Sequence, residues 1–282
     1  MASGLLSVGF IGLGSQGAPM ARRIIQGGFP VTLWARRQES LEPFRDTAAR
    51  TSPTPVALAE ASSIVCLCVT GDEDVREVSL GADGVLAGMA SGGILVVHST
   101  VHPETCKRLR EQAAENGVSV LDAPVSGGGP AAERGALLVM VGGEAAALDR
   151  VRPVLATFGD PILHLGDVGA GQTAKLVNNL VFTAQIALCL ETFAFVDELG
   201  LDQEAMAQVF ERGSGASRAA AILSASGFDI RGLGQVAGTL LRKDVNLIAD
   251  VARQHEVALP DSVGGLAEMG LLALGYAKGR SE

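Results

Sequence analysis

A glycine-rich turn near the start of the chain has the residue types and spacing of a phosphate-binding loop. It consists of Gly12, Leu13, Gly14, Ser15, Gln16 and Gly17. An apolar run precedes it and a helical pattern begins near Gln16, so Gly12 would allow a tight turn and Gly14 a close approach to a pyrophosphate. Gly17 would let helix and strand pack closely, and the free N–H groups and dipole of the helix start would hold the phosphates. The loop therefore predicts a dinucleotide site, the alternative being a glycine-rich turn without a ligand.

The end of the second predicted strand indicates which dinucleotide binds. An acidic residue there would accept hydrogen bonds from the ribose 2′-OH, but this chain has Arg36 and Arg37 at that place. Because two guanidinium groups suit a 2′-phosphate, we expect NADP as the cofactor, with NAD as the alternative. An ordinary solvated basic turn is the other interpretation of this pair.

Two later segments bring polar groups to places where a substrate can bind. The run DAPVSGG at 122–128 ends a predicted strand, and it offers the Ser126 hydroxyl and exposed N–H groups at the carboxyl end of the sheet. The run GQTAKLVNN at 171–179 opens a long predicted helix. Lys175 and Asn179 are four residues apart and therefore project from one face of that helix. An asparagine in this position can also simply pack between domains.

Up to about residue 165, short aliphatic runs alternate with longer amphipathic runs. This alternation predicts βαβ units around a parallel sheet whose strands are covered on both faces. The predicted strands are Leu6–Ile11, Val31–Ala35, Ser63–Val69, Ile94–His98, Val118–Asp122, Leu137–Val141 and Ile162–Leu165. The predicted helices are Ala18–Gln26, Pro103–Asn116 and Glu144–Phe158.

The pattern becomes helical after Gly171. The predicted helices are Gln172–Leu199, Asp202–Glu211, Ala216–Ser224, Val236–His255 and Ser262–Lys278, while 127–129 and 213–215 are expected to be loops. We therefore expect an α/β fold in which an N-terminal Rossmann dinucleotide-binding domain occupies residues 1–165. An all-α C-terminal domain with a long interdomain helix would follow over residues 166–282.

Composition and charge exclude several classes of function. The net charge of −9 and the lack of a basic block argue against binding to nucleic acid or an anionic membrane. The longest apolar stretch, Leu180–Leu190, is too short to span a bilayer, and the N-terminus lacks the features of a signal peptide. Four cysteines without CxxC spacing indicate free thiols in a reducing compartment. We expect a cytoplasmic protein without nucleic-acid or membrane partners.

The histidines do not predict a metal site or another acid/base centre. His98, His102 and His164 are separated in the sequence and have no clustered carboxylate or thiol ligands beside them. Ser126 has no neighbouring His and Asp pattern of the kind that activates a serine nucleophile. We expect no metal, and we assign His98 no role.

Five segments, in order and spacing, resemble the β-hydroxyacid dehydrogenase family. They are GFIGLGSQG at 9–17, HSTVHPET at 98–105, DAPVSGG at 122–128, GAGQTAKLVNN at 169–179 and KDVNL at 243–247. The family includes 3-hydroxyisobutyrate dehydrogenase, tartronate semialdehyde reductase and the glyoxylate and succinic semialdehyde reductases. The resemblance extends over nearly the whole chain.

The resemblance implies a role for each matching residue. Lys175 would be the catalytic lysine, which takes the hydroxyl proton in oxidation and returns it in reduction. Asn179 would bind the reacting oxygen. The substrate carboxylate would be held by Ser126, Gly127 and Gly128. The cofactor would be contacted by Val69, Thr70, Thr100 and Lys243, although Lys243 and Asp244 also fit a simple surface ion pair.

The predicted function is thus interconversion of a small 3-hydroxy acid and its semialdehyde or oxo acid by an NADP-dependent oxidoreductase. The substrate would be a small anion. Two alternatives are an imine reductase on the same fold and a non-catalytic NADP-binding scaffold, but members of both groups usually lack the lysine that this chain keeps. The apolar helix after Gly171 and the family's dimers and tetramers lead us to expect a homodimer or homotetramer.

Overall fold

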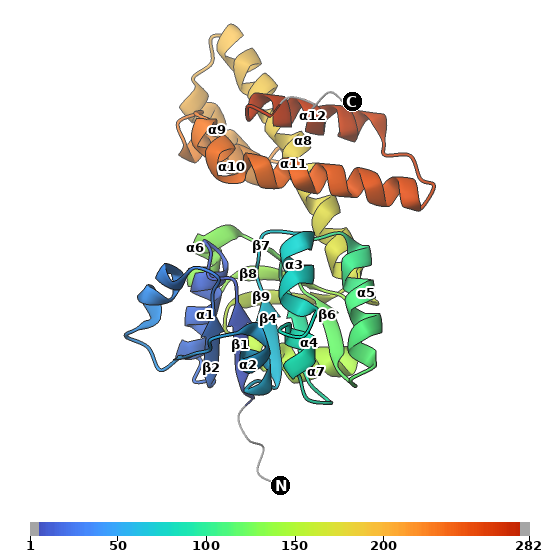
Figure 1. Ribbon diagram of the computed structural model, residues 1–282. Helices are drawn as coiled ribbons and strands as arrows, with labels where there is room; N and C mark the ends of the chain where they lie inside the picture. The colour runs from blue at the N-terminus through green and yellow to red at the C-terminus, as the bar shows by residue number, and fades with distance from the viewer. Residues whose placement is uncertain (1–5, 277–282) are drawn as a thin grey trace. The chain divides into compact units, whose positions relative to one another are not determined.

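The computed structural model describes residues 6–276, which form two compact units (Figure 1). The first unit ends at Lys175 and the second begins at Leu176, inside the helix α8 (Ala170–Glu198). The first unit is α/β and the second is built from helices. The boundary between the two units thus lies ten residues after residue 165, where the sequence pattern predicts it.

A six-stranded, fully parallel sheet lies at the centre of the first unit. Its strand order is β3-β2-β1-β4-β5-β6. The strands are β1 (Val8–Ile11), β2 (Val31–Trp34), β3 (Arg50–Thr51), β4 (Ile64–Leu67), β5 (Ile94–Val97) and β6 (Ser119–Asp122). The order reverses between β1 and β4, and in doubly wound sheets this is the position where dinucleotides bind, beyond the carboxyl ends of the strands.

Helices cover both faces of this sheet, which explains why its strands read as continuous apolar runs. Alternate residues of β1 separate into two cores, since Val8 and Phe10 pack in one cluster and Ile11 packs in the other. The covering segments are α1 (Gly17–Gln26), the 3-10 helix Gln38–Phe44, α2 (Pro55–Glu60), α3 (Asp72–Ser79), α4 (Val85–Gly88) and α5 (Pro103–Ala114).

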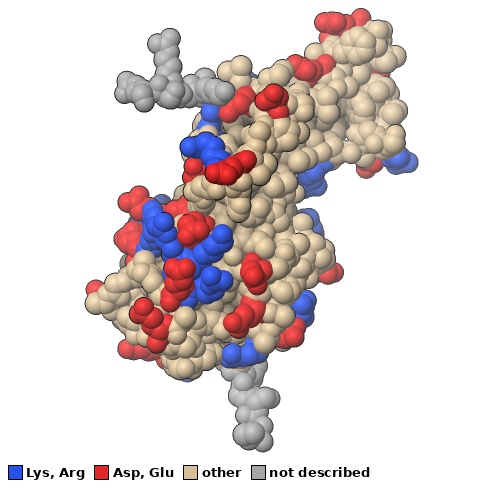
Figure 2. All heavy atoms as spheres, turned by 90° about the vertical axis from the view of Figure 1, so that its right-hand side faces the viewer, with Lys and Arg blue, Asp and Glu red and all other residues tan. Residues whose placement is uncertain are grey.

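A smaller three-stranded sheet completes the first unit. Its strand β7 (Val125–Ser126) is antiparallel to β8 (Leu137–Val141), which is parallel to β9 (Gly159–His164). The helices α6 (Gly128–Glu133) and α7 (Ala145–Leu155) accompany these strands. Figure 2 shows that the charged side chains of the first unit mix acidic with basic groups on the face it presents, without a uniformly basic surface.

The described part of the second unit, up to residue 276, continues α8 and adds four helices. These are α9 (Gln203–Arg212), α10 (Arg218–Ala225), α11 (Arg231–Gln254) and α12 (Asp261–Ala273). Its core joins Leu176 and Ile186 of α8 with Ile248 of α11. A Cβ built on Gly270 would lie 2.1 Å from the carbonyl oxygen of Thr183, so only glycine lets α12 approach α8 this closely.

The fold class expected from the sequence is confirmed: a Rossmann-like parallel sheet precedes a helical part with a long helix. Short elements were not predicted, namely β3, β7, the 3-10 helix Gln38–Phe44, α2, α3, α4 and α6. The loop expected at 127–129 is wrong, because α6 begins at Gly128. The last helix ends at Ala273, and Lys278 lies outside the described residues.

Candidate active site

The glycine loop between β1 and α1 has the shape that a dinucleotide needs. Gly12 has φ +98°, and a Cβ on it would lie 2.2 Å from the carbonyl oxygen of Cys68 at the end of β4. A Cβ on Gly17 would lie 1.8 Å from the Gly12 carbonyl oxygen. Gly14 differs, because apart from its own atoms and its chain neighbours no atom of the described residues lies within 4 Å of its Cβ position. The protein therefore requires glycine at two positions, whereas at Gly14 the open space fits a bound pyrophosphate.

The rest of the loop leaves the start of α1 available to an anion. Ser15 is exposed, Leu13 and Gln16 are half-buried, and the side chain of the N-cap residue Gln16 makes no capping hydrogen bond. The Ala18 N–H donates to the Gly14 carbonyl oxygen at 2.9 Å and Pro19 has no N–H, but the positive end of the helix dipole still suits phosphate. The residues present thus fit the dinucleotide that the sequence predicts.

The loops after β4 and β5 lie next to this turn and to each other. Cys68, which adjoins Gly12, is followed by the half-buried Val69 and the exposed Thr70. The Val69 N–H donates to the Ser99 Oγ at 2.8 Å, which joins the β4 loop to the loop that carries Thr100. The structure therefore brings the expected cofactor residues of both loops to the same edge of the sheet.

Arg36 lies at the carboxyl end of β2, as expected, but its guanidinium already has partners. One Arg36 nitrogen lies 3.0 Å from the Asp74 carboxylate and 2.8 Å from that of Glu77, both on α3. The side chain stays 57% exposed, and Arg37 beside it is exposed as well. A 2′-phosphate on the cofactor would therefore compete with two carboxylates for Arg36.

The turn expected to bind the substrate carboxylate lies beside the glycine loop. Ser126 ends β7, and Gly127 and Gly128 follow with φ values of +131° and +72°, which favour glycine. A Cβ on the next residue, Gly129, would lie 2.8 Å from the carbonyl oxygen of Ser15. Two motifs more than 100 residues apart in the sequence thus meet through a close backbone approach.

Lys175 lies in the second turn of α8 and is half-buried. It is the last residue of the first unit, which also contains the glycine loop and the Ser126 turn. Asn179 follows one helical turn later on the same helix face, in the second unit.

Within the second unit, the buried carboxylate of Asp244 holds two of the expected site residues. Its Oδ2 accepts a hydrogen bond from the Asn179 Nδ2 at 2.6 Å, and its Oδ1 lies 2.8 Å from the Lys243 Nζ. The side chain of Asp244 is only 4% exposed, so this is not the simple surface ion pair that the sequence also allowed. The structure thus joins Asn179 to Lys243 through a residue to which the sequence reasoning gave no role. The sequence feature that could have pointed to Asp244 is the KDVNL segment at 243–247, which contains it.

His98 is buried at the end of β5 and is held as a neutral imidazole. Its Nδ1–H donates to the carbonyl oxygen of Ala123 at 2.7 Å, and its ring lies 5.5 Å from that of Phe158 in an edge arrangement. Its Nε2 has no hydrogen-bond partner among the described residues. Burial lowers the pKa of His98 to about 4, and the Ala123 bond opposes this only in part.

This histidine predicts an acid-sensitive first unit. Since its folded pKa of about 4 lies below its ordinary value of 6.5, the unfolded chain binds the proton more readily. This pKa difference contributes on the order of 3 kcal/mol to the free energy of unfolding. The contribution is fully present above about pH 6.5 and is lost as the pH falls toward about 4. Urea unfolding at several pH values, followed through the fluorescence of Trp34, the single tryptophan of the chain, measures this loss.

The control replaces His98 with Gln, which removes the titrating group. We expect His98→Gln to flatten the acid side of the stability curve, whereas His255→Gln, at an exposed position, should leave the wild-type slope. Equal acid slopes in the wild type and His98→Gln would contradict the assignment.

The described residues offer no metal centre, since no group of three His, Cys, Asp or Glu side chains could hold an ion among them. The four cysteines are free thiols. Burial raises the pKa of Cys68 to about 12, so its thiol stays protonated near neutral pH.

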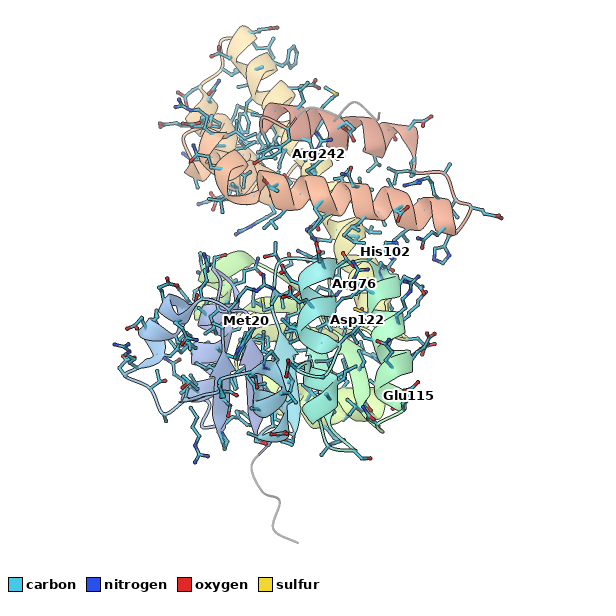
Figure 3. The ribbon with its side chains drawn as sticks, viewed as in Figure 1. Met20, Arg76, His102, Glu115, Asp122 and Arg242 are labelled. Carbon is cyan, nitrogen blue, oxygen red and sulfur yellow. The ribbon has the colours of Figure 1, made fainter. Side chains whose placement is uncertain are left out.

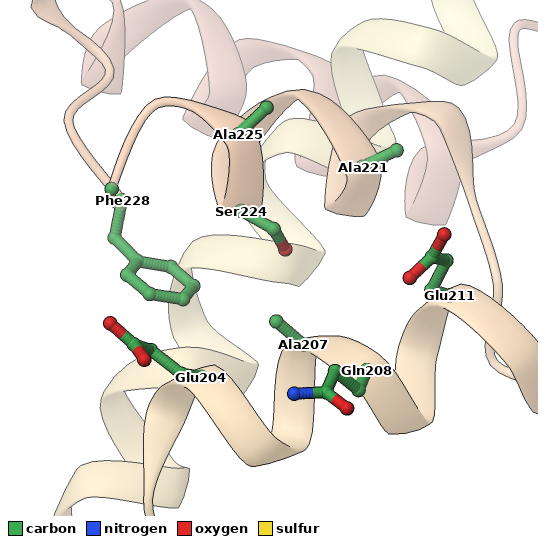
Figure 4. A pocket seen from close by; sticks show the side chains of 9 residues that line it. Glu204, Ala207, Gln208, Glu211, Ala221, Ser224, Ala225 and Phe228 are labelled. Atoms are coloured by element: carbon green, nitrogen blue, oxygen red, sulfur yellow. The ribbon is translucent and has the colours of Figure 1, made fainter.

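A pocket of about 450 Å³ lies in the second unit between α9 and α10 (Figure 4). Its lining includes Glu204, Glu211 and Phe228. None of the residues expected to bind cofactor or substrate carboxylate lines this pocket.

Two family models match successive parts of the chain. The NAD binding domain of 6-phosphogluconate dehydrogenase matches residues 7–166, and the NAD-binding domain of NADP-dependent 3-hydroxyisobutyrate dehydrogenase matches residues 169–276. The chain belongs to the β-hydroxyacid dehydrogenase family. Its first unit is accordingly a binding domain for a nicotinamide dinucleotide.

Characterised relatives in this family act on hydroxy acids. The chain is 31% identical to 3-hydroxyisobutyrate dehydrogenase of Pseudomonas aeruginosa, over 93% of this chain and 90% of the relative. It is 33% identical to 2-(hydroxymethyl)glutarate dehydrogenase of Eubacterium barkeri, over 90% and 85%. A β-hydroxyacid dehydrogenase relationship therefore spans both units.

Solved structures agree with this relationship. A Mycobacterium tuberculosis 3-hydroxyisobutyrate dehydrogenase with L-serine matches with a TM-score of 0.84 and 25% identity, over 97% of this chain and 96% of that one. Psf3 in complex with NADP+ and 2-OPP matches with a TM-score of 0.81 and 29% identity, over 96% and 95%. An imine reductase from Pseudomonas sp. has a TM-score of 0.63 and 17% identity, over 94% and 93%, and shares the fold.

Proposed function

We propose that this β-hydroxyacid dehydrogenase interconverts a small 3-hydroxy acid and its semialdehyde or oxo acid, with a nicotinamide dinucleotide as hydride carrier. The observation that carries the proposal is the close approach of Gly129 to Ser15, at 2.8 Å for the built Cβ. It puts the Ser126 turn, suited to a carboxylate, beside the loop suited to a pyrophosphate. Lys175 belongs to the same unit, so an acid/base group accompanies both binding loops.

Each residue then has a chemical task. The Ser126 hydroxyl and the N–H groups of Gly127 and Gly128 bind the substrate carboxylate, which orients the carbon that carries the reacting hydroxyl. Lys175 accepts the hydroxyl proton in oxidation and returns it in reduction, and its ammonium form stabilises the developing alkoxide. When bound, the dinucleotide accepts or supplies the hydride.

Asn179 binds the reacting oxygen in this proposal, and Asp244 determines how its amide is oriented. The Asn179 Nδ2 donates one proton to Asp244, while its Oδ1 accepts from the Asn178 Nδ2 at 3.0 Å. The second Nδ2 proton is then the donor for the substrate oxygen. Lys243, held by the same carboxylate, contributes positive charge to the cofactor.

We further propose that NADP is preferred over NAD. Arg36 and Arg37 lie at the end of β2, where the 2′-substituent of the adenosine ribose binds in Rossmann domains. Support comes from the solved relative that contains NADP+. A relative from Pseudomonas aeruginosa is, by contrast, an NAD-dependent L-serine dehydrogenase, so this preference needs its own test.

A substrate screen tests the proposed activity. The purified protein is incubated with NADPH or NADH and small semialdehydes, 2-oxo acids or cyclic imines, and in reverse with NADP or NAD and 3-hydroxy acids. We expect turnover of a hydroxy acid and its oxo partner, followed through the absorbance of the reduced nicotinamide. Dinucleotide binding without turnover would instead indicate a scaffold, and turnover confined to imines would indicate an imine reductase.

We also propose that the protein is a homodimer or homotetramer assembled through α8. The described part of this helix exposes Val177, Val181, Leu188 and Phe195, which follow one another at intervals of four or seven residues and so form a single apolar stripe. It is also the one described helix that is long and apolar enough to cross a membrane by length and composition, with 44% of its most apolar window buried. A large apolar stripe of this kind is typical of a protein interface.

Light scattering during gel filtration tests the oligomer. We expect a mass of at least twice the 28.9 kDa of one chain. Leu188→Glu with Phe195→Glu should shift the protein toward the single-chain mass, because two charges would have to be buried in the interface. Asp197→Asn, an exposed position on the opposite face of the same helix, is the control and should keep the wild-type mass. A single-chain mass for the wild type would contradict the proposal.

A further inference from the structure

We propose that Asp122 and Gln172 are positioning residues, which fix the first turn of α8, and with it Lys175, to the loops that carry Thr100 and Ser126. We call these two residues the α8 anchor. The inference rests on the proposed function, since its kinetic effect requires that Lys175 exchanges a proton with the substrate.

Asp122 caps the start of α8 from 47 residues away. Its side chain is fully buried at the end of β6, inside the first unit (Figure 3). Oδ1 accepts a hydrogen bond from the Gly169 N–H at 2.6 Å, and Oδ2 accepts one from the Gln172 N–H at 2.7 Å. The first N–H groups of a helix have no partner within it, and bonds this short to a carboxylate are among the stronger ones. A remote carboxylate thus takes the place of the usual local cap.

The surrounding backbone is shaped around this carboxylate. A Cβ on Gly142 would lie 2.5 Å from Asp122 Oδ1, and a Cβ on Gly171 would lie 2.8 Å from Oδ2. The backbone of Asp122 also exchanges two hydrogen bonds with Gly142, at 3.1 and 2.8 Å. Asp122 therefore connects β6, the end of β8 and the start of α8 at one buried point. Burial raises its pKa, an effect that the Gly169 and Gln172 N–H donors oppose.

Gln172 connects the same helical turn to the loop after β5. Its Oε1 accepts from the Val101 N–H at 3.0 Å, and its Nε2 donates to the Ser99 carbonyl oxygen at 2.8 Å. These two bonds flank Thr100. The side chain is fully buried, so water cannot replace either partner without a cost.

All these bonds lie within the first unit, which ends at Lys175. Lys175 follows Gln172 by three residues, so nearly one turn of helix separates the reacting amine from the anchored residue. The Ser126 turn follows Asp122 by four residues. Because Asp122 holds the start of α8 and lies close in the chain to Ser126, the anchor restricts how far Lys175 can move from the substrate turn.

Two isosteric variants test the anchor. Asp122→Asn must turn an NH2 group toward a backbone N–H, and Gln172→Met removes both hydrogen bonds to the Thr100 loop at similar side-chain size. We expect each to lower kcat on the order of 100-fold, the effect of a small misplacement of a reacting group. The KM for the substrate and the dissociation constant of NADPH should stay within about threefold, because the binding residues remain.

The matched control is Leu58→Ala on α2, which opens a cavity in the core of the first unit and makes none of these bonds. It should lower the melting temperature of the enzyme but keep kcat within about twofold at temperatures where it is folded. If all three variants lose kcat in proportion to their stability, the residues are merely structural and the proposal is overturned. Unchanged kcat in Asp122→Asn and Gln172→Met overturns it as well.

Hydrogen exchange supplies a readout that does not depend on activity. In Asp122→Asn the amides of Gly169 and Gln172 should exchange much faster than in the wild type, whereas Leu58→Ala should accelerate the whole first unit evenly. Unaltered exchange at these two amides would overturn the anchor even if kcat falls. Altered exchange in a protein that turns over no hydroxy acid would leave the anchor in place as a structural cap and reject its role in catalysis together with the proposed function.

Discussion

Lys175→Met is expected to lower kcat/KM for the hydroxy acid by about 1,000-fold or more, because proton transfer alone contributes about 100- to 10,000-fold in such reactions. Stabilisation of the developing alkoxide by the ammonium adds to this loss. Methionine keeps most of the side-chain length and its apolar stem, so the packing of the second turn of α8 is preserved. Steady-state rates in both directions measure the effect.

Binding measurements separate loss of chemistry from loss of fold. The dissociation constant of NADPH, from quenching of Trp34 fluorescence or from calorimetry, should remain within about threefold in Lys175→Met. Lys107→Met, which changes a lysine on α5 that pairs with Glu104 on the surface, is the matched control and should keep the wild-type rate. A Lys175→Met enzyme that retains a tenth or more of the wild-type kcat would reject the acid/base assignment.

Much of the first unit could be predicted because its strands are buried on both faces. β4 and β5 read as Ile-Val-Cys-Leu and Ile-Leu-Val-Val, continuous apolar runs that are typical of strands covered on both faces. α3 was missed since its sequence, Asp-Glu-Asp-Val-Arg-Glu-Val-Ser, buries only a few side chains against the sheet. Its three leading acidic residues stabilise the helix N-terminus instead, a signal weaker than apolar periodicity.

The candidate site likewise contains residues that the sequence predicts and residues that it does not. The glycine loop, the Ser126 turn and Lys175 occur in contiguous motifs, whose local geometry is determined by glycine and by helical spacing. Asp244 and Asp122 act on residues 65 and 47 positions away, and no local pattern indicates such partners. Both are buried carboxylates whose function becomes visible only when tertiary structure supplies their donors.

Arg36→Asp is expected to move the cofactor preference from NADP toward NAD by about 10- to 100-fold in the ratio of kcat/KM values, since a charge-assisted hydrogen bond is worth about 1.5–3 kcal/mol. An aspartate at the end of β2 would also accept a hydrogen bond from the 2′-OH of NAD. Arg45→Asp, which changes an exposed arginine beside Glu42, is the matched control and should leave the ratio unchanged. An unaltered ratio in Arg36→Asp would reject the 2′-phosphate assignment.

We expect the carboxylates that hold Arg36 to limit the proposed preference for NADP. Exposed ion pairs such as those with Asp74 and Glu77 are worth about 0.2–1 kcal/mol each, less than a phosphate contact, so the 2′-phosphate should displace them. Asp74→Asn with Glu77→Gln would free the guanidinium and remove two like charges from the phosphate. NADP affinity should then rise by about two- to thirtyfold, which is the free energy of the two ion pairs converted to a ratio of dissociation constants. NAD affinity should stay nearly constant. A fall in NADP affinity would mean that the carboxylates orient Arg36 toward the phosphate rather than compete for it.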